Sequence, residues 1–174
     1  FDCEVVRRAS TLKKRPLITG KAAYIFGVMG ELISKKPLDA KITLTYPDGS
    51  QEIIEEKILL AAVCNGKWYG GGFQLAPDAD LSDGILNVEI VRNVSRSTFI
   101  GLVPDYKKGT HINMETGELK EKFKKHIYYK KCVAVRIEGC RSVCADGEIF
   151  EEDVVDVSVI PQALNYIKDE ETKK

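Results

Sequence analysis

The hydrophobic positions of the chain follow two different periods, a helical one first and a period of two afterwards. Residues 2–14 have a helical composition with an acidic start and a basic end, which suits the helix dipole. A second helix is expected over residues 19–34, where apolar residues recur at steps of three and four. These positions form one stripe, which we interpret as a core-packing face: Ala22, Ile25, Phe26, Met29 and Ile33.

From residue 41 onward apolar and polar residues alternate, which is typical of strands with one buried face. Residues 41–46 alternate in this way, Pro47-Asp48-Gly49 predicts a turn, and a second strand begins near Gln51. That strand runs into ILLAAVCN, an apolar stretch suited to the interior of a sheet. Further alternating runs predict strands over residues 86–90, 133–137 and 155–159.

Two segments between these strands have a different pattern. A short helix is expected with four apolar residues on one face, and Pro104 should kink it or begin a new turn. Residues 111–125 read as a polar, charged connection that is partly helical. The helix's apolar face consists of Phe99, Leu102, Val103 and Tyr106.

The whole pattern contains about six to nine strands, a few helices and no strict β-α-β alternation. We therefore expect a mainly β fold with peripheral helices (α+β), built as an antiparallel β-sandwich or a barrel-like sheet.

Length and charge limit the classes of function. A chain of 174 residues is expected to form one domain. Its 26 basic and 26 acidic residues cancel, which argues against a dedicated nucleic-acid binder. Basic residues do gather locally, within the first sixteen residues and over Lys120–Lys131. No apolar run reaches 18 residues, so no membrane span is expected.

The cysteines indicate a reducing compartment. There are five, an odd number, without a CxxC pair and without a secretory signal, so we expect reduced thiols that pack as small apolar groups. His111 and His126 lack the spacing of a zinc site. Since the chain opens at Phe1 on a helical pattern, it reads as a fragment or a processed chain.

Three short elements are candidates for chemistry, and the first is Gly70-Gly71-Gly72. Phe73 and Gln74 follow it, whereas a Walker loop needs a lysine and a hydroxyl residue before a helix. The glycines instead allow unusual backbone angles or a close approach. The sequence leaves open whether they form a bulged strand or tight crossing, or whether a ligand passes beside them.

The second element is the acidic, turn-forming run from Asp78 to Gly84. Magnesium prefers carboxylate and carbonyl oxygens from a compact loop, and this run offers both. A solvated turn without an ion is the alternative.

The third element is Asp146-Gly147-Glu148, between two strand-like runs. In an extended chain the Asp and Glu side chains would point to the same side and could work as a base with a metal partner. The alternative is a hairpin turn with two exposed carboxylates.

Taken together and in this order, the elements resemble a known family. The pattern N-x3-Y-GGG-F-x3-P-x-A-x3-DG-x-L-x-V, followed some sixty residues later by DGE, is similar to the C-terminal half of the bacterial diacylglycerol-kinase-like lipid kinases. These enzymes belong to a superfamily with sphingosine kinases and NAD kinases. The opening FDCEVVRRA and the apolar helix after it match that half as well, so the resemblance runs from Phe1 to about Tyr166. Only the connection from Met114 to Lys125 looks longer than typical.

The resemblance implies a domain organisation. Residues 1–167 would form the β-sandwich substrate domain and residues 168–174 a polar tail. The family's N-terminal nucleotide-binding domain, with its GGDGT motif, is absent from these residues.

The resemblance also implies roles for individual residues. Asp146 matches the family's general base, and Glu148 matches a carboxylate near the metal and phosphate network. A structural Mg²⁺ site would use the carboxylate of Asp83 and the backbone carbonyls of Asp80 and Ile85. The remaining matched positions would place backbone beside the substrate cleft: Asn65, Gly70, Gly71 and Gly72.

The function implied is transfer of the γ-phosphate of ATP to diacylglycerol or a similar lipid alcohol. The enzyme would be cytoplasmic and peripheral at the inner face of the membrane, where Lys120–Lys131 with Tyr128 and Tyr129 could contact anionic lipid. This chain alone would be inactive, and a homodimer stays open. Three alternatives remain: a kinase for a sphingoid lipid, ceramide or glycolipid; a non-catalytic lipid- or ligand-binding β-sandwich; and a nucleotide kinase of the NAD-kinase type.

Overall fold

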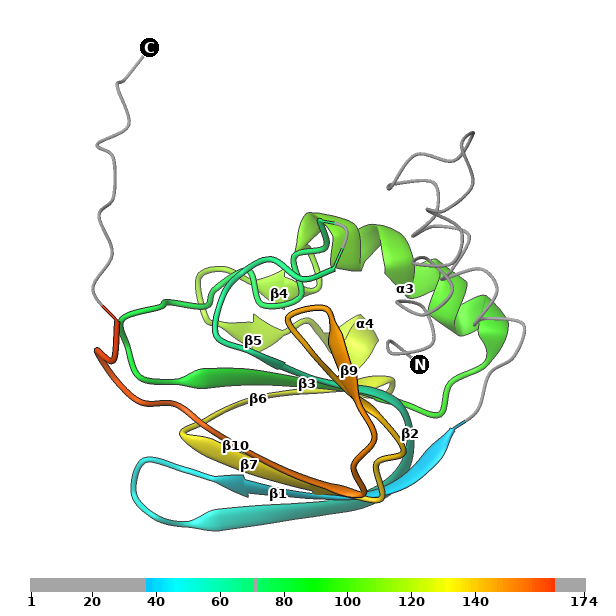
Figure 1. Ribbon diagram of the computed structural model, residues 1–174. Coiled ribbons are helices and arrows are strands. Elements are labelled where there is room, and N and C mark those ends of the chain that lie inside the picture. Colours follow the sequence, from blue (N-terminus) through cyan, green and yellow to red (C-terminus); the bar gives the residue numbers. More distant parts are fainter. Residues whose placement is uncertain (1–36, 71, 165–174) are drawn as a thin grey trace, which may run out of the picture.

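A computed structural model of the 174-residue chain describes residues 37–70 and 72–164. The helices expected over residues 2–14 and 19–34, and the polar tail, lie outside this part of the chain. Every strand pairing in the described part is antiparallel, and two helices lie on one side of the large sheet (Figure 1). The expected fold class, mainly β with peripheral helices, is therefore confirmed.

The large sheet has six strands in the order β10-β7-β1-β2-β3-β6. It curls, so that β6, β7 and β10 lie between β3 and the β1–β2 hairpin (Figure 1). One face of these strands therefore meets in a single apolar cluster, which includes Ile42, Val88 and Val135. The strands are β1 (Leu38–Thr45), β2 (Gln51–Cys64), β3 (Leu86–Arg92), β6 (Ile127–Cys132), β7 (Ala134–Glu138) and β10 (Val154–Ser158).

The β1–β2 hairpin forms where the alternation predicted it, with Thr45 opposite Gln51 and a turn between them. β2 is long enough to serve two cores. A register shift between Ile58 and Leu60 interrupts its pairing with β3. Ile58 packs in the apolar cluster inside the curl, and Leu59 packs on the opposite face of the sheet. This long strand therefore connects the two layers of the domain.

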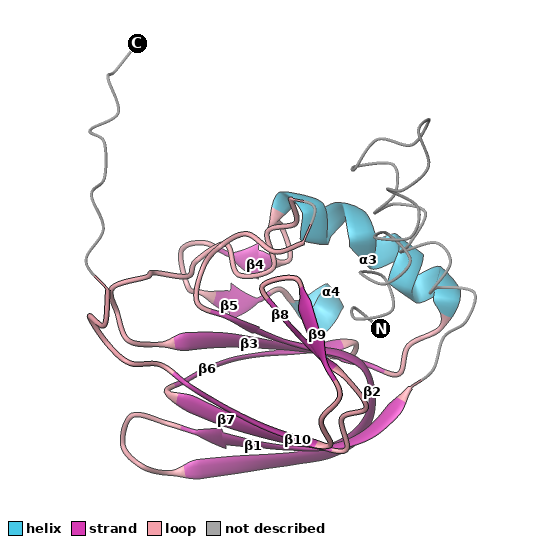
Figure 2. Ribbon diagram, viewed as in Figure 1, coloured by secondary structure: helices cyan, strands magenta, loops and turns pink. Residues whose placement is uncertain are grey.

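Helix α3 (Arg96–Lys108) covers the outer face of the sheet, as Figure 2 shows. Ser95 caps its N-terminus, because the Ser95 side chain accepts a hydrogen bond from the Thr98 amide. Three of the four residues expected on its apolar face are buried, and Val103 is half-buried. The helix continues through Pro104, which lies exposed, to Lys108, so Pro104 starts no separate helix.

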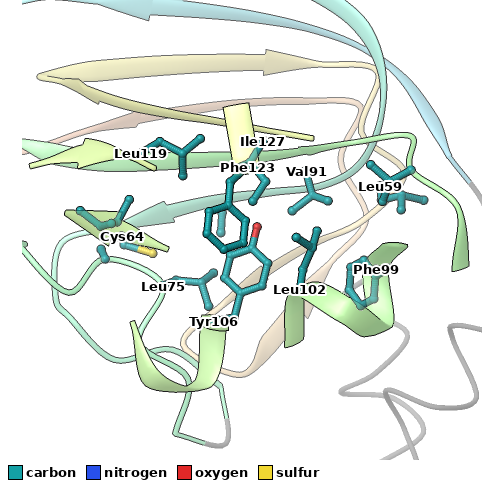
Figure 3. Close-up of a cluster of buried hydrophobic side chains, with 14 of the residues drawn as sticks. Leu59, Cys64, Leu75, Val91, Phe99, Leu102, Tyr106, Leu119, Phe123 and Ile127 are labelled. Atoms are coloured by element: carbon teal, nitrogen blue, oxygen red, sulfur yellow. The ribbon is translucent and has the colours of Figure 1, made fainter. Parts of the chain in front are cut away.

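Residues 111–125 form more structure than a polar connection. They contain β4 (Ile112–Asn113), β5 (Glu118–Leu119) and the short helix α4 (Glu121–Lys124). One apolar side chain from each of the three elements is buried in the cluster under α3, where Figure 3 shows Phe123 beside Tyr106. The prediction of partial helix is confirmed, but this segment also contributes to the core.

A second small hairpin, β8 (Val143–Ala145) and β9 (Glu148–Phe150), rises from the ends of β7 and β10 (Figure 1). Its two strands pair with each other and with no other described strand. At its base the amides of Gly139 and Cys140 both donate to the carbonyl of Asp153, at 3.0 and 3.1 Å. The hairpin is thus closed at its base and carries its turn away from the sheet.

Candidate functional site

The turn of the β8–β9 hairpin carries the candidate base. Ala145 pairs with Glu148, so Asp146 and Gly147 are the two loop residues. Their φ angles are +48° and +94°, and two successive positive φ values characterise the type I′ turn that favours Asp-Gly. Asp146 is exposed at this turn, and no described residue forms an ion pair with it. The carboxylate is therefore accessible to a substrate.

Glu148 is exposed as well and begins β9. The hairpin alternative from the sequence is confirmed, and the extended-chain interpretation is wrong. Because Asp146 sits in a turn rather than in a strand, strand alternation does not place the two carboxylates on the same side. They remain neighbours only through the turn that joins their strands.

Gly70 and Gly72 lie in a tight turn. Tyr69 and Phe73 pair across it, with N···O distances of 2.7 and 2.9 Å, and Gly72 has φ +89°. No described atom lies within 4 Å of a Cβ placed on Gly72. The turn therefore needs glycine at position 72 for its backbone angle and not for a crossing within the described chain. Gly70 is exposed, Gly71 lies outside the described residues, and Asn65 is exposed directly after β2.

The acidic loop is closed by its own side chains. Asp80 Oδ1 accepts from the amide and hydroxyl of Ser82, at 2.9 and 2.6 Å, and Asp83 Oδ1 accepts from the amide of Ile85 at 2.8 Å. The bonds to Ser82, together with the charge of Lys67, lower the pKa of Asp80. Both aspartates are exposed, so this loop is a set of aspartate-closed turns with carboxylate and carbonyl oxygens at its surface.

The loop and the candidate base do not form one cluster. In Figure 1 the segment directly before β3 lies at the left edge of the molecule, whereas the β8–β9 turn lies at its centre. Within the described ranges, no group of three or more His, Cys, Asp or Glu side chains converges as a metal cluster would. An ion in the acidic loop would thus depend on backbone carbonyls and would lie apart from Asp146.

A buried polar network fixes the segment between the glycine turn and the acidic loop. His111 is fully buried, and its Nε2 donates to the carbonyl of Leu75 at 3.0 Å. Asp78 Oδ1 accepts from the hydroxyl of Tyr129, and Asp78 Oδ2 lies 2.8 Å from Lys131 Nζ. These contacts connect residues 75–78 to the sheet and to the β4 region.

Glu89 completes this network from the outer face of β3. Its Oε2 lies 3.2 Å from His111 Nε2, and both side chains are almost fully buried. Burial raises the pKa of Glu89, and the opposing effect of His111 does not cancel it. Burial alone would lower the pKa of His111, but the hydrogen bond and charge of Glu89 outweigh it, so that pKa is raised too. The pair therefore holds a proton more tightly than either group does in water.

The sequence pattern alone does not reveal this network. The signal available was that Asn87 and Glu89 occupy alternate positions in a strand whose remaining residues up to Val91 are apolar. That pattern normally places such residues in solvent, but here Asn87 is buried against Asp78 and Tyr129, and Glu89 is buried against His111.

The basic run Lys120–Lys131 does not form one positive surface, because β5, α4 and β6 divide it and most of its lysines have acidic partners. Lys130 lies 2.8 Å from Glu52, and Tyr129 is partly buried. The other pairs are Lys122 with Asp105, Lys124 with Glu121, and Lys131 with Asp78.

The buried thiols behave as expected of small apolar groups. Cys64 and Cys132 are both buried, and burial raises their pKa values to about 12 and about 11. No helix in the described part of the chain has the length and apolar character needed to cross a bilayer.

Comparison with known families identifies the chain. Residues 1–168 match the YegS C-terminal NAD kinase beta sandwich-like domain. The chain belongs to this family. The match confirms the resemblance carried by the glycine turn, the acidic loop and the Asp-Gly-Glu element.

Relatives of this YegS-type domain include enzymes named as kinases. A diacylglycerol kinase of Mycobacterium tuberculosis is 29% identical over 168 residues, which cover 97% of this chain and 49% of the relative. A diacylglycerol kinase of Bacillus subtilis is 28% identical over 137 residues, covering 78% of this chain and 40% of the relative. The chain thus spans about half the length of these relatives or less.

A solved structure of a candidate diacylglycerol kinase from Bacillus anthracis str. Sterne has the same fold. It superposes with a TM-score of 0.54 at 21% identity, and the alignment covers 81% of this chain and 44% of that one. At this identity the likeness establishes the fold of the domain and nothing about its substrate.

Proposed function

We propose that this chain is the lipid-binding, base-donating half of an ATP-dependent lipid kinase whose acceptor is diacylglycerol or a similar lipid alcohol. The observation that carries the proposal is the exposed carboxylate of Asp146, on a hairpin turn that stands clear of the sheet. The family of the domain and the kinase names of its relatives support the same reaction class. The enzyme would work at the inner face of the cytoplasmic membrane, where its substrate is.

The chemistry assigned to Asp146 follows from phosphoryl transfer. The acceptor hydroxyl must lose its proton as its oxygen bonds to phosphorus, and a carboxylate within hydrogen-bond reach can take that proton. Asp146 is exposed and has no ion-pair partner among the described residues, so it is available for this role. Glu148, at the start of β9, would add negative charge beside the turn and orient the groups around it.

ATP would supply the phosphoryl group, and its binding site would lie mainly in the part of the protein that precedes this chain. This assignment fits the coverage of the relatives, of which the chain matches about half. The glycine turn, with Asn65 before it, offers exposed backbone to the boundary between the two parts.

The acidic loop fits a structural Mg²⁺ site. Asp80 and Asp83 each use Oδ1 within the loop, which leaves a second carboxylate oxygen available on each residue. With the carbonyls of Asp80 and Ile85, these are the oxygen ligands that Mg²⁺ prefers. An Mg²⁺-induced rise in melting temperature that Asp83→Ala abolishes would support the site, and an equal rise in both proteins would contradict it.

The experiment that tests the proposed reaction is substitution of the base in the full-length enzyme. We expect Asp146→Asn to lower kcat by about 10²–10⁴-fold with little change in the KM for lipid, since a base acts in the transition state. Asp48→Asn is a matched control, because Asp48 also occupies an exposed hairpin turn, between β1 and β2. A kcat equal to that of the wild type in Asp146→Asn would remove Asp146 from the mechanism.

A panel of acceptors separates the alternatives. Diacylglycerol, a sphingoid base, ceramide, a glycolipid and NAD would be compared as substrates of the full-length enzyme. Phosphorylation of NAD alone would replace the lipid assignment, and no phosphorylation of any acceptor would favour a non-catalytic binding module. ATP-dependent phosphorylation by the purified 174-residue chain alone would contradict the proposal that ATP binds mainly outside this chain.

A further inference from the structure

The β8–β9 hairpin has an apolar patch, formed by Val143 and Phe150, beside the turn that carries Asp146. Ala145 pairs with Glu148 and Val143 pairs with Phe150, so these four side chains share one face of the hairpin. Val143 is half-buried, whereas Phe150 is 46% exposed although its side chain is large and apolar. The hairpin therefore presents an aromatic ring to its surroundings two residues beyond Glu148.

The packing of the domain makes little use of this apolar patch. Of the residues that the structure describes, neither apolar cluster includes Val143 or Phe150. The hairpin also stands apart from the large sheet, since its two strands pair with each other and with no further strand of the described chain (Figure 2). The exposed ring thus keeps apolar area that a bound molecule would remove from water.

The apolar patch is close enough to Asp146 to contact an acceptor held there. A general base must come within about 3 Å of the hydroxyl from which it takes the proton. Two residues along a strand cover about 7 Å, so Phe150 lies about 7 Å beyond Glu148, where the strand leaves the turn. In an acceptor lying along the hairpin, the groups that follow the hydroxyl would therefore reach Phe150.

The order of polar and apolar residues on the hairpin matches that of a lipid alcohol. The carboxylates of Asp146 and Glu148 are at the turn, and Val143 with Phe150 follows two residues further along the strands. A lipid alcohol likewise has a polar hydroxyl end followed by hydrocarbon. With its hydroxyl at Asp146, its hydrocarbon would cover Phe150 and leave the carboxylates to the polar end.

The charge of the hairpin favours an acceptor without phosphate groups. Residues 139–153 contain five acidic residues and one basic residue, all of them exposed. The acidic residues are Asp146, Glu148, Glu151, Glu152 and Asp153, and the basic residue is Arg141. A surface with this excess of negative charge repels anions. An uncharged lipid alcohol therefore fits the hairpin, whereas a nucleotide or a phospholipid would bring phosphate groups beside carboxylates.

We propose that Phe150, together with Val143, contacts the hydrocarbon of an uncharged acceptor lipid and sets the preference for its chain length. This assignment rests on the proposed function, because Asp146 defines where the hydroxyl lies. Phe150 touches none of the reacting atoms in this arrangement, so it determines specificity and takes no part in proton transfer. Its contact is the same before and during the reaction, and such uniform binding lowers KM without changing kcat.

The first test measures phosphorylation of dihexanoylglycerol, dioctanoylglycerol and didecanoylglycerol by the full-length enzyme in detergent micelles. We expect Phe150→Ser to lower kcat/KM for didecanoylglycerol by about ten- to hundred-fold, mainly through KM, and to have less effect as the chains shorten. Phe150→Leu should keep most of the wild-type value. The matched control Ile53→Ser also replaces an exposed apolar residue, 57% exposed on β2, and should behave like the wild type.

Three outcomes of this series would overturn the proposal. The first is a wild-type kcat/KM of Phe150→Ser for every acceptor, which would show that no acceptor contacts the ring. The second is an equal loss for all chain lengths, which would assign Phe150 to a contact within the protein. The third is a loss of the same size in Ile53→Ser.

A second readout needs no phosphoryl transfer. In the full-length protein without ATP, the emission of Phe150→Trp minus that of the wild type isolates the new tryptophan. This emission should shift to shorter wavelength when the micelles contain didecanoylglycerol, and it should not shift with micelles alone. Ile53→Trp is the control and should show no shift with either. Equal shifts in the two variants, or no shift in Phe150→Trp, would contradict contact with the lipid.

The chain-length proposal and the kinase proposal fail separately. A lipid-dependent shift of Phe150→Trp without phosphorylation of any acceptor would support the contact and overturn only the kinase assignment. Phosphorylation of diacylglycerol with no effect of either substitution, Phe150→Ser or Phe150→Leu, would overturn only the contact.

Discussion

The two faces of strand β3 lie in different environments. On the inner face, Leu86, Val88 and Ile90 pack in a cluster inside the curled sheet whose buried members are all apolar. On the outer face, Val91 packs in the cluster under α3, while Asn87 bonds to Asp78 and Tyr129 and Glu89 contacts His111. Both faces are buried, yet every buried polar or charged residue of the described chain belongs to the outer layer or contacts it.

The difference suggests separate roles: the inner face stabilises the fold, and the outer face holds a loop in place. The buried side chains of the inner cluster are apolar, so their contribution to the free energy of unfolding depends on their volume and on the apolar area that they bury. The outer layer includes hydrogen bonds to the loop that carries the candidate functional elements, through Leu75 and Asp78. Substitutions on the two faces should therefore have different signatures as well as different sizes.

The largest expected effect is the loss of a side chain from the inner face. Ile90 is fully buried, and Ile90→Ala should lower the free energy of unfolding by about 2–5 kcal/mol through lost apolar contact and the cavity left behind. Urea denaturation measures this loss, and it should be the same at acidic and neutral pH. Ile53→Ala is the control, since Ile53 is 57% exposed. A loss for Ile90→Ala as small as that for the control would break the comparison.

A smaller effect is expected from one hydroxyl group of the outer network. Tyr129→Phe removes the donor to Asp78 and the acceptor of Asn87, and should cost about 1–3 kcal/mol because each of these groups loses a hydrogen bond. Hydrogen exchange should show the amides near Asp78 less protected. Tyr128→Phe is the matched control on the neighbouring residue of β6, whose hydroxyl bonds to the half-buried Glu56. Equal hydrogen exchange of these amides in the two variants would show that the Tyr129 hydroxyl does not hold the segment around Asp78.

The smallest and most specific effect is a change in pH dependence. The pKa values of both Glu89 and His111 are raised, so the folded state holds a proton that the unfolded chain releases above the ordinary values of 4.5 and 6.5. The stabilisation by this pair is thus complete at acidic pH and is lost as pH rises through the folded-state pKa values.

Glu89→Gln sharpens this prediction, because it leaves burial as the main influence on His111. The pKa of His111 should then fall below 6.5, and its contribution should reverse, so that stability rises with pH through that value. The difference in free energy of unfolding between wild type and variant should change by about 1 kcal/mol for each unit by which the pKa is shifted. Urea denaturation from about pH 5 to pH 8 measures it. Parallel pH profiles would show that the pair does not titrate as described.

The sequence predicted the elements with a regular apolar pattern. β1, the start of β2, β3, β7 and β10 alternate apolar and polar residues, although both faces of β3 are buried, and α3 has its apolar residues at helical spacing. The strand β6 was not predicted, because Tyr128, Lys130 and Lys131 break the alternation. Their charges and hydroxyl groups bond to residues of β2 and of the loop before β3, and no local pattern encodes those partners.

The candidate site was predictable only in part. The Asp-Gly pair predicted the hairpin turn, because few residues other than glycine and aspartate accept its backbone angles. The wrong interpretation, an extended chain through Asp146, treated the turn as part of a strand. The contact of Glu89 with His111 joins distant segments of the chain, so it cannot be read from the spacing of residues along the sequence.

The β8–β9 hairpin, which carries Asp146 in its turn, is a structural unit of its own. Its strands do not pair with the large sheet, and two amides on one carbonyl close its base. Residues 139–153 can therefore be replaced as one unit without changing the pairing register of any strand in the large sheet. The length and sequence of the turn can vary there while the scaffold beneath is unchanged.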